Sequence, residues 1–250
     1  MGALAILVPG NVMPELKATN FFDEQQAANY DKNFAKLKPI QEALHLLSGA
    51  VLAELPAKAH LLCVGAGTGS ELIYLAEKFP EWRFTAVEPS LPMLNVCQRR
   101  AEQCGIASRC HFHAGYLDTL SQANRFDAAT AFLVSHFITN YEDRRAFFKA
   151  IAGRLHPGGY LLSADLSSDV ASLPYQQLLE VWMRLLRQTG SPAEKIENLR
   201  VTYSRDVALL PVGVMSDLIA SAGFQTPVLF LQTGLIHAWF TQKGEVTARL

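Results

Sequence analysis

A glycine-rich segment and the acidic residue Glu88, nineteen positions beyond its last glycine, carry the strongest chemical signal in this sequence. Residues 61–64 (Leu-Leu-Cys-Val) are four consecutive apolar residues, which predict a buried parallel strand. They lead into residues 65–69 (Gly-Ala-Gly-Thr-Gly), after which a helical pattern begins at Glu71. This order lets a cofactor lie against backbone at a helix N-terminus, with no Cβ atoms to hold it away.

Glu88 completes the pattern. Residues 82–88 predict a second strand that ends in this acid. An acid at the tip of the second strand accepts hydrogen bonds from the ribose hydroxyls of an adenosine. A solvated carboxylate at a strand end is the alternative for Glu88 alone, but its combination with the glycine loop favours the ribose role.

The glycine spacing separates two classes of cofactor. A dinucleotide site prefers Gly-x-Gly-x-x-Gly, whereas this chain has Gly-x-Gly-x-Gly with Ser70 at the third glycine of that fingerprint. Residues 64–71 (VGAGTGSE) instead resemble the first motif of the class I S-adenosylmethionine-dependent methyltransferases.

Further motifs of that family follow along the chain. Residues 87–90 with Met93 resemble its second motif, residues 126–127 the opening of its fourth strand, and residues 155–160 (LHPGGY) the turn before strand five. The resemblance therefore covers roughly residues 20–242.

The resemblance implies an α/β fold: a Rossmann-like, doubly wound, seven-stranded, mostly parallel sheet with an antiparallel last strand. A helical cap is expected after strand five, at about residues 168–205, where residues 174–187 form a strongly amphipathic helical pattern. Residues 1–35 are expected to form an N-terminal tail and lid segment, and residues 36–250 the methyltransferase-like domain.

The resemblance also implies S-adenosyl-L-methionine as the cofactor. After strand three, Gly115 or Tyr116 occupies the position where many relatives have an acid, so backbone and the Tyr116 ring are expected to recognise adenine, with Asp118 as the alternative. The expected cofactor-binding residues are Gly65, Ala66, Gly67, Gly69, Glu88, Pro89, Met93, Tyr116, Leu117, Phe132 and, from the lid, Tyr30.

Methyl transfer is an in-line displacement, so the protein must mainly align donor and acceptor, and a general base is optional. His136 follows strand four and is the predicted catalytic base, because histidine titrates near neutrality. The alternative is a hydrogen-bonded histidine that caps the next helix. Arg200, Tyr203 and Trp182 are the predicted substrate residues, with core packing as the competing interpretation of Trp182.

Arg200 supports an alternative reaction. The C-terminal third is similar to the bacterial carboxy-S-adenosylmethionine synthases of transfer-RNA wobble-uridine modification, which place an arginine at the matching spacing before Ala222. In those enzymes the arginine pairs with the extra carboxylate of the cofactor, for which a guanidinium is a natural bidentate partner. The glycine loop here departs from theirs.

We therefore expect a methyltransferase acting on an oxygen or nitrogen of a small-molecule acceptor. A carboxy-S-adenosylmethionine synthase and a non-catalytic S-adenosylmethionine-binding protein are the alternatives. Twenty-two basic against twenty-three acidic residues give no strong nucleic-acid signal. The four cysteines lack metal-ligand spacing, so no metal site is expected. With no membrane-spanning stretch or targeting leader, a cytoplasmic location is expected, and a homodimer is compatible with the sequence.

Overall fold

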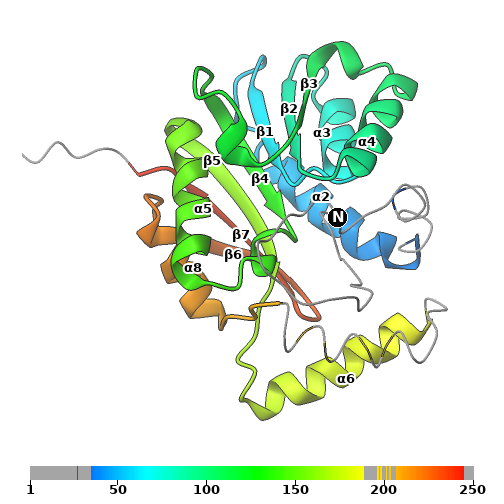
Figure 1. The fold of residues 1–250 in the computed structure, drawn as a ribbon, viewed down its shortest axis with the longest axis vertical. Coiled ribbons are helices and arrows are strands. Elements are labelled where there is room, and N and C mark those ends of the chain that lie inside the picture. The colour runs from blue at the N-terminus through cyan, green and yellow to red at the C-terminus, as the bar shows by residue number, and fades with distance from the viewer. Residues whose placement is uncertain are drawn as a thin grey trace, which may run out of the picture.

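The computed structural model describes Ala27, residues 35–188, Ile196, Asn198, Val201, Tyr203 and residues 207–244. A seven-stranded sheet lies between two layers of helices (Figure 1). The strands are β1 (His60–Val64), β2 (Arg83–Glu88), β3 (Cys110–Ala114), β4 (Phe126–Phe132), β5 (Leu155–Leu166), β6 (Val228–Thr233) and β7 (Ile236–Gln242). The α-helices are α2 (Lys38–Val51), α3 (Ser70–Lys78), α4 (Leu91–Gln103), α5 (Tyr141–Arg154), α6 (Leu173–Gln188) and α8 (Val212–Ser221). Short 3-10 helices are η2 (Ala35–Leu37), η3 (Ala107–Arg109), η4 (Leu117–Thr119) and η5 (Ser135–Phe137).

The strand order β3-β2-β1-β4-β5-β7-β6 confirms the predicted fold. Strand β1 pairs in parallel with both β2 and β4, so the order reverses between β1 and β4. Strand β7 runs antiparallel to β5 and β6, as expected for the last strand. In an open α/β sheet, ligands bind at the carboxyl ends of the strands where the order reverses.

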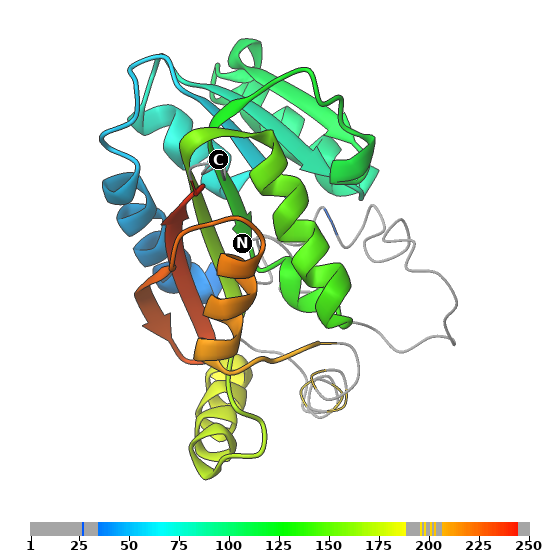
Figure 2. The ribbon, with the colours of Figure 1, turned by 90° about the vertical axis from the view of Figure 1, so that its left-hand side faces the viewer.

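Both faces of the sheet are covered, which explains the unbroken apolar run in β1. Leu61 and Cys63 pack among residues of α2, α3 and α4, whereas Leu62 and Val64 pack among residues of α5 and α8. Side chains alternate between the faces of a strand, so a strand buried on both faces needs apolar residues throughout. Figure 2 shows α5 and α8 in front of the sheet and α2 beyond its edge.

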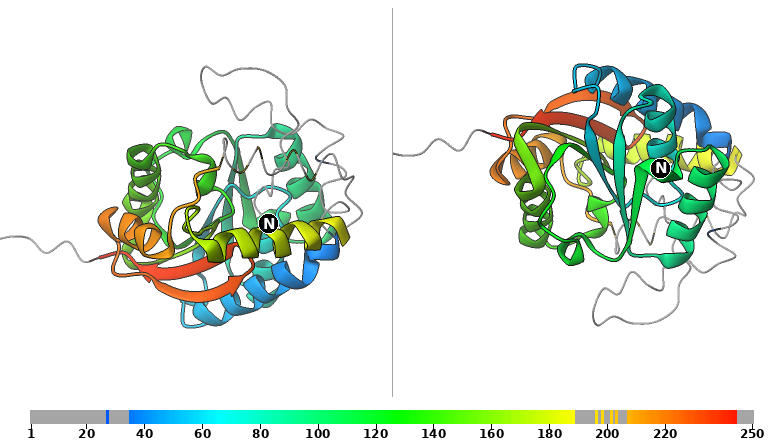
Figure 3. Two further views of the ribbon diagram at one scale, coloured as in Figure 1. Left: turned by 90° about the horizontal axis from the view of Figure 1, so that it is seen from below. Right: turned by 90° about the horizontal axis from the view of Figure 1, so that it is seen from above.

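Helix α6 follows β5 and lies beyond the carboxyl ends of the strands (Figures 1 and 3). Its buried residues Trp182, Met183 and Leu186 pack with Leu235, in the turn before β7, and with Ile236, the first residue of β7. The predicted extents of the cap and of the lid remain predictions, because most of residues 189–206 and 1–34 fall outside the described part. Within that described part, no helix is both long and apolar enough to cross a membrane.

Strand β5 begins earlier than its sequence suggests. The segment from residue 155 to 160 was expected to be a turn, but Leu155 already pairs with Phe126 and the ladder then shifts register before Ala128. Gly158 has a φ of +72° within this segment. The Pro-Gly-Gly sequence is therefore accommodated as an irregularity in the strand, which is the usual structural role of a bulge.

Glu71 is an unusual buried acid at the start of α3. Its side chain is 1% exposed, and neither carboxylate oxygen has a hydrogen-bond partner among the described residues. Burial raises the pKa of Glu71 above its ordinary value. The folded state therefore holds a proton that the unfolded chain releases at lower pH, and this contribution to stability is lost as pH rises from about 4.5 through the folded pKa.

We predict that Glu71→Gln gains stability relative to the native chain as pH rises. Urea unfolding should show a larger advantage for the variant at pH 8 than at pH 5, because only the native chain loses the stability that the bound proton contributes. Glu77→Gln, an exposed change on the same helix, is the control. An equal difference at both pH values would contradict the prediction.

Candidate functional site

The carboxyl ends of five parallel strands bring the candidate site together. It comprises the glycine loop after β1, Glu88 at the end of β2, residues 115–117 after β3, residues 133–136 after β4 and Asp165, the second-last residue of β5. The first three form one group, and the last two form a second group across the point where the strand order reverses.

Neighbouring protein side chains lie very close to the backbone of the glycine loop at two positions. Gly65 and Gly69 have φ values of +68° and +81°. A Cβ atom on Gly65 would lie 2.4 Å from Val134 Cγ2, and one on Gly69 would lie 2.4 Å from Cys97 Sγ. We expected these glycines to clear space for a cofactor, but at both positions the close approach of another element already requires glycine.

Glu88 is fixed against this loop. Its carboxylate accepts a hydrogen bond from the Gly67 amide at Oε2 and one from the Ser90 amide at Oε1, each 2.9 Å long. The side chain is 8% exposed, and burial raises the pKa of Glu88 to about 7 despite these two bonds. Each oxygen retains a second lone pair. The carboxylate is thus oriented and able to accept from two ribose hydroxyls, so it fits the adenosine half of the expected cofactor.

Neighbouring side chains brace the loop and the start of α4. Arg100 donates from Nη1 to the Thr68 carbonyl at 2.9 Å and to Ser70 Oγ at 3.1 Å. Pro89 is half-buried, and Met93 is buried against Ala27. Pro89 directly follows Glu88, and the Met93 amide donates at 3.4 Å to the side chain of Ser90, whose own amide donates to Glu88.

The segment after β3 is tied to α5. Arg154 donates from Nη2 to the carbonyls of Leu117 at 2.7 Å and Leu120 at 3.1 Å, and Thr119 Oγ1 donates to the Tyr116 carbonyl at 2.7 Å. Tyr116 is 42% exposed, whereas Leu117 is buried. The exposed Tyr116 ring is therefore accessible to a ligand, whereas the buried Leu117 side chain is not and only its backbone could contact one. Arg154 was not anticipated from the sequence.

A strained residue ends β4. Leu133 has a φ of +58°, and its amide donates to the Ala164 carbonyl at 2.6 Å. A non-glycine residue in this region costs roughly 1–3 kcal/mol and is usually found at functional sites. The turn directs Ser135 and His136 toward Asp165 of β5. Phe132, just before it, is buried with 1% exposure, so only its backbone is placed to line the site.

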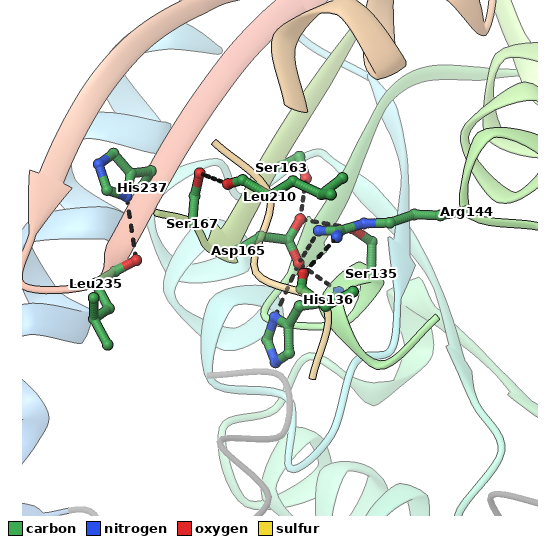
Figure 4. A network of polar contacts seen from close by, with 10 residues as sticks. Ser135, His136, Arg144, Ser163, Asp165, Ser167, Leu210, Leu235 and His237 are labelled. Carbon is green, nitrogen blue, oxygen red and sulfur yellow. Dashed lines mark hydrogen bonds and ion pairs between the residues drawn. The ribbon is translucent and has the colours of Figure 1, made fainter. Parts of the chain in front are cut away.

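Asp165 is the centre of a buried polar network (Figure 4). Its Oδ1 accepts from the His136 amide at 2.9 Å and lies 3.0 Å from His136 Nδ1, while its Oδ2 accepts from Ser135 Oγ at 2.7 Å and Ser163 Oγ at 3.2 Å. Arg144 donates from Nε to Ser135 Oγ at 2.8 Å, and its Nη2 lies 3.6 Å from Asp165 Oδ1.

The contacts in this network determine the protonation states of Asp165 and His136. Burial opposes ionisation of Asp165, but Arg144 and the hydrogen bonds from His136 and Ser135 outweigh it and lower the pKa of Asp165. Burial lowers the pKa of His136; Asp165 opposes this change and Arg144 adds to it. His136 is thus neutral near pH 7, with its proton on Nδ1, facing the carboxylate. Nε2 then carries the lone pair that a general base requires.

The alternative interpretation of His136 as a helix cap is wrong, because Asn140 is the N-cap of α5.

The remaining predicted residues are those expected to contact the substrate and the residue of the lid. Trp182 Nε1 donates to Tyr203 Oη at 3.0 Å, and both residues are buried in one apolar cluster, where they pack with each other. Their substrate role remains a prediction. Tyr30 and Arg200 lie outside the described residues.

Asp165 and Arg144 were missed from the sequence. Asp165 is near the end of a predicted strand, as Glu88 is, and the same rule would have found it. Arg144 has no such signal, because an arginine on a predicted helix is usually solvated.

Residues 61–159 match the family model described as a methyltransferase domain. This segment is therefore similar to a methyltransferase domain. The match confirms the predicted family and supports S-adenosylmethionine as the cofactor.

Relatives extend the comparison beyond this domain. An uncharacterised protein of a Synechococcus strain is 34% identical over 105 residues, which are 42% of this chain and 24% of that protein, so the chain spans about a quarter of its length. A carboxy-S-adenosyl-L-methionine synthase of Campylobacter hominis is 26% identical over 84% of this chain and 89% of its own. An O-methyltransferase family 2 protein from Planctomyces limnophilus, solved with apigenin, shares the fold with a TM-score of 0.59 and 19% identity, over 90% of this chain and 63% of its own.

We predict that affinity for S-adenosylhomocysteine rises with pH through about 7, because Glu88 ionises there and the carboxylate is the stronger hydrogen-bond acceptor. Glu88→Gln should remove this pH dependence and weaken binding at pH 8 by about 1.5–3 kcal/mol. Calorimetric titration between pH 6 and 8.5 measures both. Glu102→Gln on the exposed side of α4 is the control, and an unchanged affinity in Glu88→Gln would rule out the ribose role.

Proposed function

We propose that this chain is an S-adenosylmethionine-dependent methyltransferase that transfers the methyl group to an oxygen or nitrogen of a small-molecule acceptor. The observation that carries the proposal is a neutral, oriented imidazole at the same sheet edge as the glycine loop and Glu88. Gly65 of that loop is in close contact with Val134, two residues before His136, so the two groups are joined by direct packing.

The cofactor half of the site is built by the first three strands. Glu88 would accept from the ribose hydroxyls, residues 65–69 would face the ribose and methionine portions, and the segment held by Arg154 would border the adenine. When bound, S-adenosylmethionine supplies an electrophilic methyl group on a sulfonium sulfur. The chain's task is then to align an acceptor with that methyl group and to exclude water.

His136 would remove the acceptor's proton. As the acceptor oxygen or nitrogen forms its bond to the methyl carbon and the sulfur–carbon bond breaks, the proton of that oxygen or nitrogen passes to His136 Nε2. Asp165 then faces an imidazolium and stabilises it through the bond at Nδ1, which is 3.0 Å long. Figure 4 shows the second ring nitrogen pointing away from the carboxylate, as this role requires.

The nature of the acceptor follows from burial and charge. His136 is 1% exposed, so an acceptor must come close to Nε2 in an enclosed position, which favours a small molecule over a polymer. The structural likeness to an O-methyltransferase solved with apigenin also supports a hydroxyl acceptor.

A carboxy-S-adenosylmethionine synthase is the second candidate, because that relative aligns with most of this chain. It would use Arg200 to bind the extra carboxylate, and it has no need for the His136–Asp165 pair as a base. The presence of that pair in a buried network is the reason for preferring methyl transfer.

The small molecule carried by the full chain separates the candidates. We predict that denaturation of the purified protein, followed by mass spectrometry, releases S-adenosylmethionine or S-adenosylhomocysteine. Incubation with S-adenosylmethionine and a panel of phenols, alcohols and amines should then yield S-adenosylhomocysteine and a methylated product in equal amounts. Release of the carboxylated cofactor, with no transfer to any acceptor, would favour the synthase.

With an acceptor identified, we predict that His136→Gln lowers kcat by about 10²–10⁴, the range for loss of a working general base. Affinity for S-adenosylhomocysteine should stay within about twofold of the native value, since His136 belongs to the acceptor half of the site. A loss smaller than tenfold would return His136 to a structural role. His111→Gln, at an exposed position on β3, is the histidine control.

A further inference from the structure

Arg144 is the buried cation of the second group of site residues. Its side chain is 1% exposed, reaches from α5 beneath the end of β4, and donates to Ser135 Oγ at 2.8 Å and to the Ala208 carbonyl at 2.9 Å. Its Nη2 lies 3.6 Å from Asp165 Oδ1, the oxygen that also faces His136 (Figure 4). A guanidinium held this rigidly acts as a fixed positive charge.

The charges around His136 come from two elements. Among the described residues, Asp165 of β5 contributes a negative charge and Arg144 of α5 a positive one, and the Phe137 ring lies next to the imidazole on its own 3-10 helix. With Asp165 alone, a buried carboxylate would draw a proton onto the imidazole, since a buried charge needs a partner. Arg144 already balances that carboxylate, so a protonated His136 would leave a net positive charge in the interior.

We propose that Arg144 is a positioning residue that balances the charge of Asp165 and thereby keeps His136 neutral, with the Nε2 lone pair available to the acceptor. The proposal rests on the proposed function, because it assigns the control of the base in that reaction. The lowered pKa of His136, to which Arg144 contributes after burial, agrees with the geometry.

Arg144 also contacts residues 208–210, the segment that precedes α8. The Ala208 carbonyl accepts from Arg144, and the Ala208 amide donates to the His136 carbonyl at 2.9 Å. Two residues on, the Leu210 carbonyl accepts from Ser167 Oγ at 2.6 Å. Residues 208–210 are thus held against the ends of β4 and β5, and Arg144 is bonded to both the base's neighbour Ser135 and this segment.

The test is the titration of His136 in the full-length protein without any acceptor. The histidine ring signal of His136 is assigned by its loss in His136→Gln and followed by heteronuclear NMR from pH 5 to 9. We expect Arg144→Gln to raise the pKa of His136 by about 1 or more, the effect of a charge at this distance. Arg144→Lys, which keeps the positive charge, should leave it close to the native value.

Arg145→Gln is the matched control, since Arg145 is the next residue on α5 and pairs with Glu142 at the surface. If Arg144→Gln does not fold, Asp165→Asn alone is compared with the double variant Arg144→Gln/Asp165→Asn, which buries no unpaired charge. The pKa of His136 should then be higher in the double variant. A His136 pKa that is the same with and without Arg144, within about 0.3, overturns the proposal.

Failure of this proposal and of the proposed function can be told apart. If Arg144→Gln raises the pKa of His136 but the native protein transfers no methyl group, the role of Arg144 is supported and the proposed function is wrong. If the native protein transfers methyl groups but the pKa of His136 is unchanged in Arg144→Gln, the proposed function is supported and the role of Arg144 is wrong. When both hold, the acid limb of the kcat/KM profile should move to higher pH in Arg144→Gln by the same amount as the titration, which a purely structural role would not produce.

Discussion

The second half of the site depends on one constraint: the carboxylate of Asp165 is fully buried and must be compensated. An isolated buried carboxylate would be prohibitively costly, so its position dictates what surrounds it. Two serine hydroxyls, a backbone amide, an imidazole and a guanidinium converge on it from η5, β5 and α5. The strained turn at Leu133 and the attachment of Ala208 are consequences of this convergence, because they bring the chain within reach of the carboxylate and its arginine.

Two acids at one sheet edge have opposite properties because their surroundings differ. Glu88 is buried, its partners among the described residues are two backbone amides, and its pKa rises to about 7. Asp165 is more deeply buried, yet its pKa falls because Arg144 supplies a full positive charge. A carboxylate that titrates near neutrality suits reversible binding of neutral hydroxyls. A carboxyl group whose pKa is lowered suits the orientation of a histidine for which we propose proton transfer.

The sequence predicted well those parts of the fold in which the contacting residues are close together along the chain. The glycine loop and Glu88 are found because a strand, a turn and a helix start follow one another along the chain, and the next strand ends beside them. Even there the physical reason differed at Gly65 and Gly69, where packing against Val134 and Cys97 sets the requirement. His136 was found as a residue, but its alternative as a helix cap was wrong because Asn140 fills that position. Trp182 and Tyr203 turned out to bond to each other, a pairing that spacing alone does not indicate.

The sequence by itself determined the sheet, the order of its elements and the glycine loop with Glu88 beside it, because apolar periodicity and turn chemistry act between near neighbours. Tertiary structure alone decided the polar network around Asp165. His136 and Asp165 are 29 residues apart, and Ala208 follows Arg144 by 64 residues, so their contacts exist only once β4, β5 and α5 have packed. Protonation states are set by those contacts and by burial, and neither quantity is a property of the linear chain.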